Sequence, residues 1–144
     1  MKYTKELARI AKAHGGTLYP RDVVDAARDP KSLLHGAFEW NDGIAAEQWR
    51  LEQARHLIRV QVTLLQNSNE PIQAYISLSP LRSEEGGYIP IRDVLSNKKL
   101  LEQMKADAAR ELEIFSVKFR EIDELRPVLT EAGKFVKSQK RKGK

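Results

Sequence analysis

Three arginines on one segment are the side chains best suited to bind a charged ligand. Arg50, Arg55 and Arg59 lie in a stretch from Ile44 to about Arg59 whose apolar residues recur with helical spacing. A guanidinium presents its donors as a planar fork that matches phosphate oxygens and the major-groove edge of guanine. The pattern therefore predicts a helix that could contact DNA.

The second basic feature is the end of the chain. The formal net charge is +5, but residues from Lys134 onward carry six basic side chains and no acid, which leaves −1 for the preceding 133 residues. These cations are Lys134, Lys137, Lys140, Arg141, Lys142 and Lys144. We expect residues 134–144 to be a disordered arm that binds phosphates without sequence preference. The alternative is a solubilising terminus with no partner.

Residue types that support catalysis are sparse. His14, His35 and His56 are far apart, and no pair of them shows metal-ligand spacing. The chain has no cysteine, which removes thiolate metal sites and disulfides. The least unfavourable catalytic pair is His35 with Glu39, beside Trp40, and a structural histidine is its alternative. We therefore expect a binding protein that is not an enzyme and that uses no metal or cofactor.

Length and composition limit the architecture. The chain has 144 residues, of which 41% are hydrophobic and 31% charged, as in one domain with well-solvated helices. No apolar run is long enough to cross a membrane, and residues 1–6 do not resemble a signal peptide. We expect one domain over residues 1–133 in a reducing cytoplasm, without membrane association.

The N-terminal half reads as three helices. The first two are expected at residues 4–14 and from Pro20 to about Arg28. The third covers residues 44–59, with Asn41 or Asp42 as its N-cap.

The pattern then changes to alternation. Residues 60–64 and 72–78 alternate apolar and polar side chains around the polar turn 66–71, which predicts a β-hairpin with one apolar face. Residues 82–87 read as a polar loop, and residues 88–91 as a third strand at an edge, where Pro90 is tolerated.

One long helix is expected after the sheet, from a cap at Ser96 to about Leu125. Its apolar stripe repeats every seven residues through Leu101, Ala108, Phe115, Ile122 and Leu129, and Pro127 interrupts the stripe before Leu129. The stripe could form an oligomer seam through residues 98–125, but its residue types favour packing within the chain.

The predicted fold class is α+β: N-terminal helices, an antiparallel hairpin or three-stranded sheet, and a long C-terminal helix. The element order also fits a winged helix, in which Gln61 and residues 66–69 form the wing. The long gap between the second and third helices argues against it, as do Glu47 and Glu52 on the reading helix. In the alternative α+β domain the arginines are solvated or paired, as Glu47 could pair with Arg50.

Three aromatic residues, Phe38, Trp40 and Trp49, flank the start of the third helix. Bases can stack on such rings, but aromatic residues near a turn more often belong to the core, and we expect that here.

Residues 34–59 carry a further pattern: Leu34-His35, Phe38-Glu39-Trp40, Ala45-Ala46, Trp49-Arg50, Gln53-Ala54-Arg55 and Leu57-Ile58-Arg59. Together with Tyr88–Leu95, Glu111-Leu112 and Lys118-Phe119, it resembles a group of small phage and prophage proteins, most without an assigned function. The resemblance implies a viral or prophage product in the cytoplasm of a bacterial host, and it transfers no catalytic residue.

The leading functional expectation is binding of nucleic acid, in particular double-stranded DNA, in phage regulation or DNA processing. The expected contacts are Arg50, Arg55, Arg59, Lys134, Lys137, Lys140, Arg141 and Lys142. The alternative is a protein-interaction module, an inhibitor or assembly factor of a host or phage protein that uses the long C-terminal helix. Salt separates the two, because phosphate binding weakens steeply with salt and an apolar interface does not.

Overall fold

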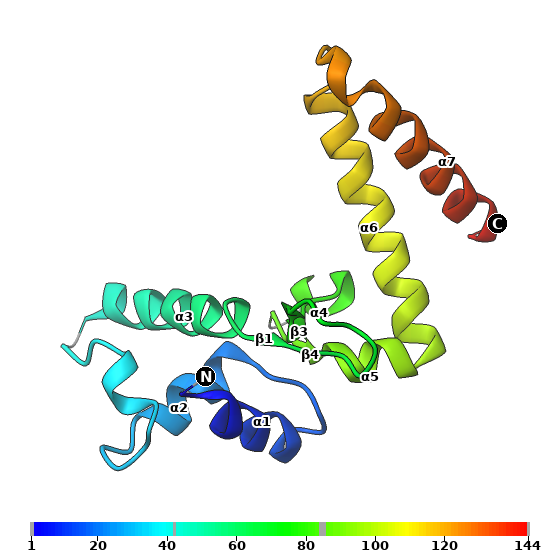
Figure 1. The fold of residues 1–144 in the computed structure, drawn as a ribbon. Coiled ribbons are helices and arrows are strands. Elements are labelled where there is room, and N and C mark those ends of the chain that lie inside the picture. Colours follow the sequence, from blue (N-terminus) through cyan, green and yellow to red (C-terminus); the bar gives the residue numbers. More distant parts are fainter. Residues whose placement is uncertain (1, 42, 84–85, 144) are drawn as a thin grey trace. The chain divides into compact units, whose positions relative to one another are not determined.

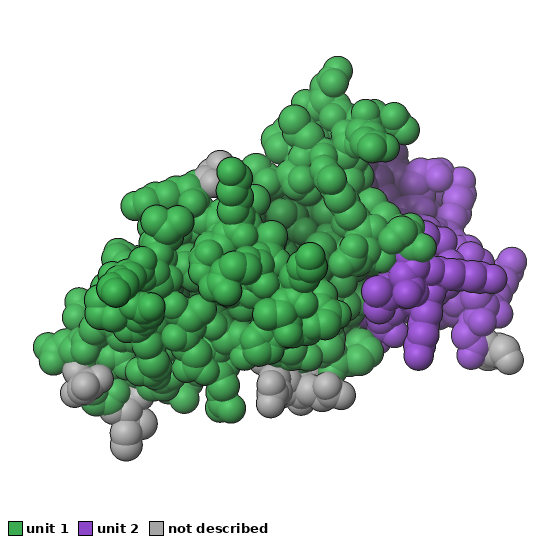
Figure 2. Space-filling view, turned by 90° about the horizontal axis from the view of Figure 1, so that it is seen from below, with its two compact units in different colours: residues 1–96 green, residues 97–144 purple. Residues whose placement is uncertain are grey.

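The chain forms two compact units. The computed structural model describes residues 2–41, 43–83 and 86–143, and the units cover residues 1–96 and 97–144, coloured green and purple in Figure 2. The structure thus divides the chain after Ser96, whereas the sequence predicts a boundary after Gly133.

The first unit carries helices and short strands, and its α+β class is as predicted (Figure 1). Its elements are, in chain order, α1 (Thr4–Ala13), α2 (Pro20–Ala27), the 3₁₀ turn η1 (His35–Ala37), α3 (Ile44–Arg59), β1 (Val62–Thr63), β2 (Ile72–Gln73), β3 (Tyr75–Ile76), α4 (Ser79–Ser83), β4 (Ile89–Pro90) and α5 (Ile91–Ser96).

Local sequence explains the first two helices, which the apolar periodicity predicts correctly. α1 ends before Gly15 and Gly16, whose φ angles of 67° and 90° are open to glycine at little cost. α2 begins at Pro20, where the fixed φ of proline suits a first helical turn.

α2 and α3 pack together, and α1 joins them around the core of the first unit. The largest fully buried side chains include Leu7, Leu18, Val24, Leu34 and Ile58. Apolar residues of all three helices, and of the links between them, therefore share one core.

α3 begins without a side-chain cap. Its N-cap is Gly43, so the expected cap at Asn41 is wrong, and the alternative at Asp42 lies outside the described residues. Contacts of Glu47, Arg50 and Leu57, further along the helix, hold it in place.

Two small antiparallel sheets replace the expected continuous hairpin. β1 pairs with β2, and β3 pairs with β4, so the predicted third strand is present. A bridge between Leu18 and Tyr88 ties the link between α1 and α2 to this region.

The predicted apolar face of the hairpin is wrong in detail. Val62 and Leu64 are exposed, and Tyr75 is buried in place of its neighbours Ala74 and Ile76. The cause is a change of partner at Ala74, whose N–H donates to Gln61 O (2.9 Å) and whose carbonyl accepts from the Ile91 N–H (2.8 Å). The alternation of side chains is broken at this residue because β2 and β3 belong to different sheets.

The expected wing also differs from the structure at Gln61. Its side chain is buried, donates to Leu57 O (3.0 Å) and meets the Thr4 hydroxyl (3.3 Å). Gln61 therefore holds the end of α3 against α1. The expected polar loop 82–87 begins within α4, and residues 84 and 85 lie outside the described residues.

The second unit is a helical hairpin of α6 (Lys98–Lys118) and α7 (Arg126–Lys142), joined through the 3₁₀ turn η2 (Asp123–Leu125) (Figure 1). The sequence places the N-cap one residue early. Asn97, not Ser96, caps α6, because its Oδ1 accepts from the Lys99 N–H (3.0 Å) and the Leu100 N–H (3.1 Å).

The expected helix to Leu125 is also too long. α6 ends at Lys118, so Ile122 and Leu129 are not on the same helix as the start of the seven-residue stripe. Pro127, which the sequence treats as an interruption, stands in the first turn of α7, where a missing N–H costs nothing.

The basic tail is helical through Lys142, so its predicted disorder is wrong over this range. Ala132 and Val136, one turn apart, are buried, and α7 packs against α6. Burial of this apolar pair gives the segment a tertiary reason to be a helix. Lys144 lies outside the described residues.

Candidate nucleic-acid interface

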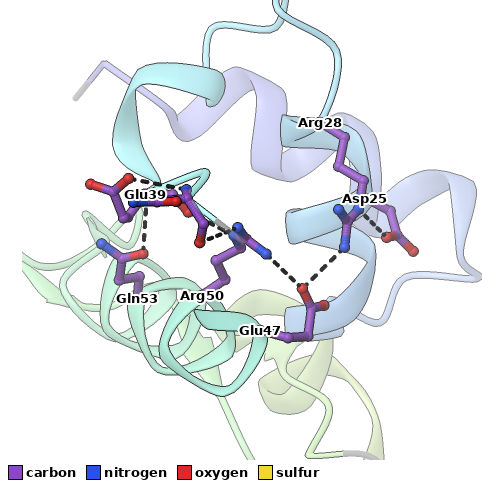
Figure 3. Close-up of polar contacts among 7 residues, drawn as sticks. Asp25, Arg28, Glu39, Glu47, Arg50 and Gln53 are labelled. Carbon is purple, nitrogen blue, oxygen red and sulfur yellow. Dashed lines mark hydrogen bonds and ion pairs between the residues drawn. The ribbon is translucent and has the colours of Figure 1, made fainter. Parts of the chain in front are cut away.

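Arg50, the first arginine of the predicted reading helix, points inward. Its side chain is 3% exposed. Nε donates to Glu39 O (2.6 Å), Nη2 donates to Asn41 O (3.3 Å), and Nη1 contacts Glu47 Oε2 (3.2 Å) (Figure 3). The guanidinium thus satisfies backbone carbonyls of the irregular segment before α3. Arg50 is not placed to contact DNA, which corrects the sequence-based expectation.

Glu47 extends this network to α2. Its Oε2 also binds Arg28 Nη2 (3.1 Å), and Arg28 in turn contacts Asp25 (3.4 Å) (Figure 3). The predicted pair of Glu47 with Arg50 is confirmed. One carboxylate therefore joins an arginine of α3 to the arginine that follows α2, and so holds the two helices together.

His35 packs in the same region. Its ring stacks on Trp40, with centroids 5.0 Å apart, and the Trp40 indole N–H donates to His35 O (3.0 Å). His35 Nδ1 lies 2.8 Å from Ala27 O, and it must carry the proton because a carbonyl oxygen only accepts.

Glu39, the other member of the suggested catalytic pair, is engaged elsewhere. Its carboxylate accepts from the Asn41 N–H (3.1 Å). Among the described residues, the His35 and Glu39 side chains share no hydrogen bond. The geometry favours the structural histidine over a catalytic pair.

The other two arginines of α3 remain at the surface. Arg55 is partly exposed and pairs with Glu52 on the same helix. Arg59, the last residue of α3, is exposed and makes no hydrogen bond or ion pair with the part of the chain that the structure describes. Of the three predicted contacts on α3, only Arg59 presents an uncompensated charge.

The aromatic residues also separate. Phe38 is buried and Trp40 packs against the core of the first unit, as expected. Trp49 is 60% exposed, so its expected place in the core is wrong. Arg50, the next residue along α3, occupies the inward position instead.

The basic residues of the second unit form one face of α7. At about 100° per residue, four of its cations fall within about 80° of arc, on the side away from the buried Ala132 and Val136. They are Arg126, Lys134, Lys137 and Arg141. We call these four residues the basic face. Arg126 is the one member of the basic face that the sequence pattern did not single out. A helical periodicity that runs from residue 126 past Gly133 into the tail would have included it.

Some of these charges are already paired. Arg126 contacts Asp123, and Lys134 contacts Glu131 (2.7 Å), in exposed pairs between neighbouring turns. Lys137 and Arg141 make no hydrogen bond or ion pair with the described residues. Exposed ion pairs contribute little free energy, so a stronger anion can replace the carboxylates.

The two other tail cations that the structure describes, Lys140 and Lys142, lie beside the basic face. Lys140 pairs with Glu113 of α6. The pKa of Glu102 is lowered mainly by the hydrogen bond from Lys105, and Lys142 adds to this effect through its charge. Both lysines therefore contact or approach acids of α6, in contrast to Lys137 and Arg141.

The second unit also exposes apolar side chains. Ile114 and Val117 of α6 are 68% and 67% exposed, and Val128 of α7 is exposed as well. From the predicted stripe, Ala108 and Phe115 face solvent. Large exposed apolar residues of this kind are candidates for a protein contact.

The described residues contain neither a metal-binding cluster of side chains nor a membrane-spanning helix. No group of three histidine, aspartate or glutamate side chains there is arranged to hold a metal ion. Within residues 2–41, 43–83 and 86–143, every helix is too short or too polar to cross a membrane.

Comparisons of this chain with protein-family models, with curated proteins and with solved structures found no match.

Proposed function

We propose that this protein binds nucleic acid through the phosphate backbone, and that the basic face of α7 is the contact surface. The observation that carries the proposal is the alignment of four cations on one side of an ordered helix, opposite its buried side. Cations held on an ordered helix, as in the basic face, lose less conformational entropy on binding than those of a disordered arm do.

The dimensions of the basic face suit a duplex. Arg126 and Arg141 lie about 22 Å apart along the helix, at about 1.5 Å per residue. Duplex DNA carries about one phosphate per 1.7 Å of its axis, so this row meets several phosphates at once. Contacts of this kind position a protein on DNA and read no sequence by themselves.

The number of contacts can be measured through salt. Each neutralised duplex phosphate lowers the slope of log affinity against log salt by about 0.9. Contact by all four cations predicts a slope of roughly −3 to −4 for a random-sequence duplex.

The experiment measures this slope for the intact chain and for a Lys137→Ala, Arg141→Ala double variant. The variant should bind more weakly, with a slope less steep by about 2, because two phosphate contacts are lost. An unchanged slope would place the phosphate contacts elsewhere. A truncation after Gly133 is a less clear test, because it also removes the buried Val136.

A second function, protein interaction, is favoured by the exposed Ile114 and Val117. Their replacement by serine should weaken an apolar protein contact and leave the duplex slope unchanged, since neither side chain can meet a phosphate. A partner interface of this kind would also show little dependence on salt.

A further inference from the structure

The outward side of α3 carries an exposed aromatic ring, that of Trp49, which makes no ring contact or hydrogen bond with the described residues. Trp49 is 60% exposed, although a tryptophan commonly buries about 150–250 Å². His56 follows two turns later on the same side of the helix, and Arg59 lies near its end. This arrangement combines a stacking surface, a hydrogen-bonding ring and a cation along one helix.

A hollow lies beside these residues. Its volume is about 430 Å³, and its lining includes Ala37, Trp49, Gln53, His56 and Arg59. This size falls in the range of small-ligand sites. We call it the Trp49 groove.

The charge of the Trp49 groove is positive at the end of α3. Glu52 also lines the groove, but its carboxylate pairs with Arg55. Arg59 has no such partner among the described residues. An anionic ligand is therefore attracted to the Arg59 end, while the aromatic end near Trp49 suits a flat, uncharged group.

We infer that the Trp49 groove binds single-stranded nucleic acid, with an unpaired base stacked on Trp49 and a phosphate at Arg59. Trp49 and Arg59 are about 15 Å apart along α3, a distance that a short stretch of single strand can span. Gln53 and His56 lie between them and can hydrogen-bond to base edges.

The same chemistry excludes a duplex from this groove. In the interior of a duplex, neighbouring bases cover both faces of each base, so no face there is open to Trp49. Unpaired bases expose these faces, and stacking on an aromatic side chain is the common way to bind them. The Trp49 groove and its single-stranded ligand are therefore distinct from the duplex contact at α7.

The first measurement is the fluorescence of Trp49 during titration with oligothymidylate. Trp40, the other tryptophan, packs against the core, so the change should come mainly from Trp49. Stacking predicts quenching of the emission and protection from acrylamide. Neither effect should occur with a blunt duplex of equal length.

Substitutions then test the residue itself. Trp49→Ala should weaken binding of the single strand by about 5- to 150-fold, and Trp49→Phe by much less, because phenylalanine retains a stacking face. Leu33→Ala is the matched control, since Leu33 is an equally exposed apolar side chain of the same unit. Full affinity in Trp49→Ala, or absence of quenching in the intact chain, would overturn the inference, and the groove would then suit a peptide better.

Two variants distinguish single-strand binding at the Trp49 groove from duplex binding at α7. The Lys137→Ala, Arg141→Ala variant should lose duplex affinity and keep the quenching by oligothymidylate. Trp49→Ala should keep its duplex affinity and the salt slope.

Discussion

The guanidinium of Arg50 lies 5.1 Å from the centre of the Trp40 ring, in a contact between α3 and the irregular segment that precedes it. Arg28, which follows α2, also approaches this ring, at 5.8 Å. Trp40 therefore connects two arginines that share the carboxylate of Glu47. The arrangement makes Arg50 a structural residue and leaves the phosphate contacts to other cations.

The first prediction concerns Arg50. Arg50→Ala should lower the free energy of unfolding by about 2–4 kcal/mol, because Glu39 O, Asn41 O and Glu47 lose a buried partner. Arg50→Lys should recover little of this, since an ammonium group lacks the planar fork. Urea unfolding measures both changes.

Arg55→Ala is the control for Arg50, because it removes an exposed ion pair of the same helix. Its effect should stay below about 1 kcal/mol. If Arg50→Ala kept full stability and lost duplex affinity, the structural role would be wrong.

The second prediction concerns the cap of α6. Asn97→Ala should cost about 1 kcal/mol, because the N–H groups of Lys99 and Leu100 lose their acceptor. Ser96→Ala should change stability by less than about 0.5 kcal/mol, since Ser96 is exposed and its side chain bonds, among the described residues, only to Asp93 O. The two variants are compared by urea unfolding, and the reverse order of effects would restore Ser96 as the cap.

The third prediction concerns a close approach at Gly87. A Cβ at this position would lie 2.7 Å from Tyr19 Cε1 and 2.8 Å from Thr17 Cγ2. Gly87→Ala should therefore lower stability by about 1–3 kcal/mol, through displacement of these side chains. Gly36→Ala is the control, because nothing lies within 4 Å of its added Cβ. Equal melting temperatures for the two variants would contradict this close packing around Gly87.

The fourth prediction is a loss of stability at high pH. Burial raises the pKa of Tyr75 above its ordinary value of 10.0. Above this pH the unfolded chain releases the Tyr75 proton while the folded chain retains it, so stability falls as pH rises toward the higher folded pKa. Tyr75→Phe should lose less stability between pH 9 and 11 than the intact chain does. An identical pH dependence in both proteins would show that Tyr75 does not contribute.

Local patterns account for much of this fold. Gly15 and Pro20 mark helix ends that follow from backbone preferences alone, and the alternation at residues 60–64 and 72–78 reveals paired strands. The change of partner at Ala74 could not be predicted, because it depends on Gln61 and Ile91, which are distant in sequence.

The candidate site was harder to predict than the fold. Helical periodicity predicted that Trp49 faces the core and that Arg50 faces solvent, because apolar residues are normally buried. The structure reverses the two, since Trp40 and the Glu39 and Asn41 carbonyls create a polar, aromatic pocket for a guanidinium. In the tail, the many charged residues led to a prediction of disorder. Burial of the apolar pair Ala132 and Val136 instead makes the basic residues part of a helix.

The most direct test of the central claim is duplex binding by a charge-reversal variant with a matched control. Lys137→Glu with Arg141→Glu reverses two cations of the basic face, and Lys5→Glu with Lys12→Glu makes the same change in net charge on α1, where both lysines are exposed. We expect the α7 variant to lose salt-sensitive binding of a random duplex and the α1 variant to keep most of it. Equal losses in the two variants would show that net charge alone governs binding, and would contradict a phosphate contact at α7.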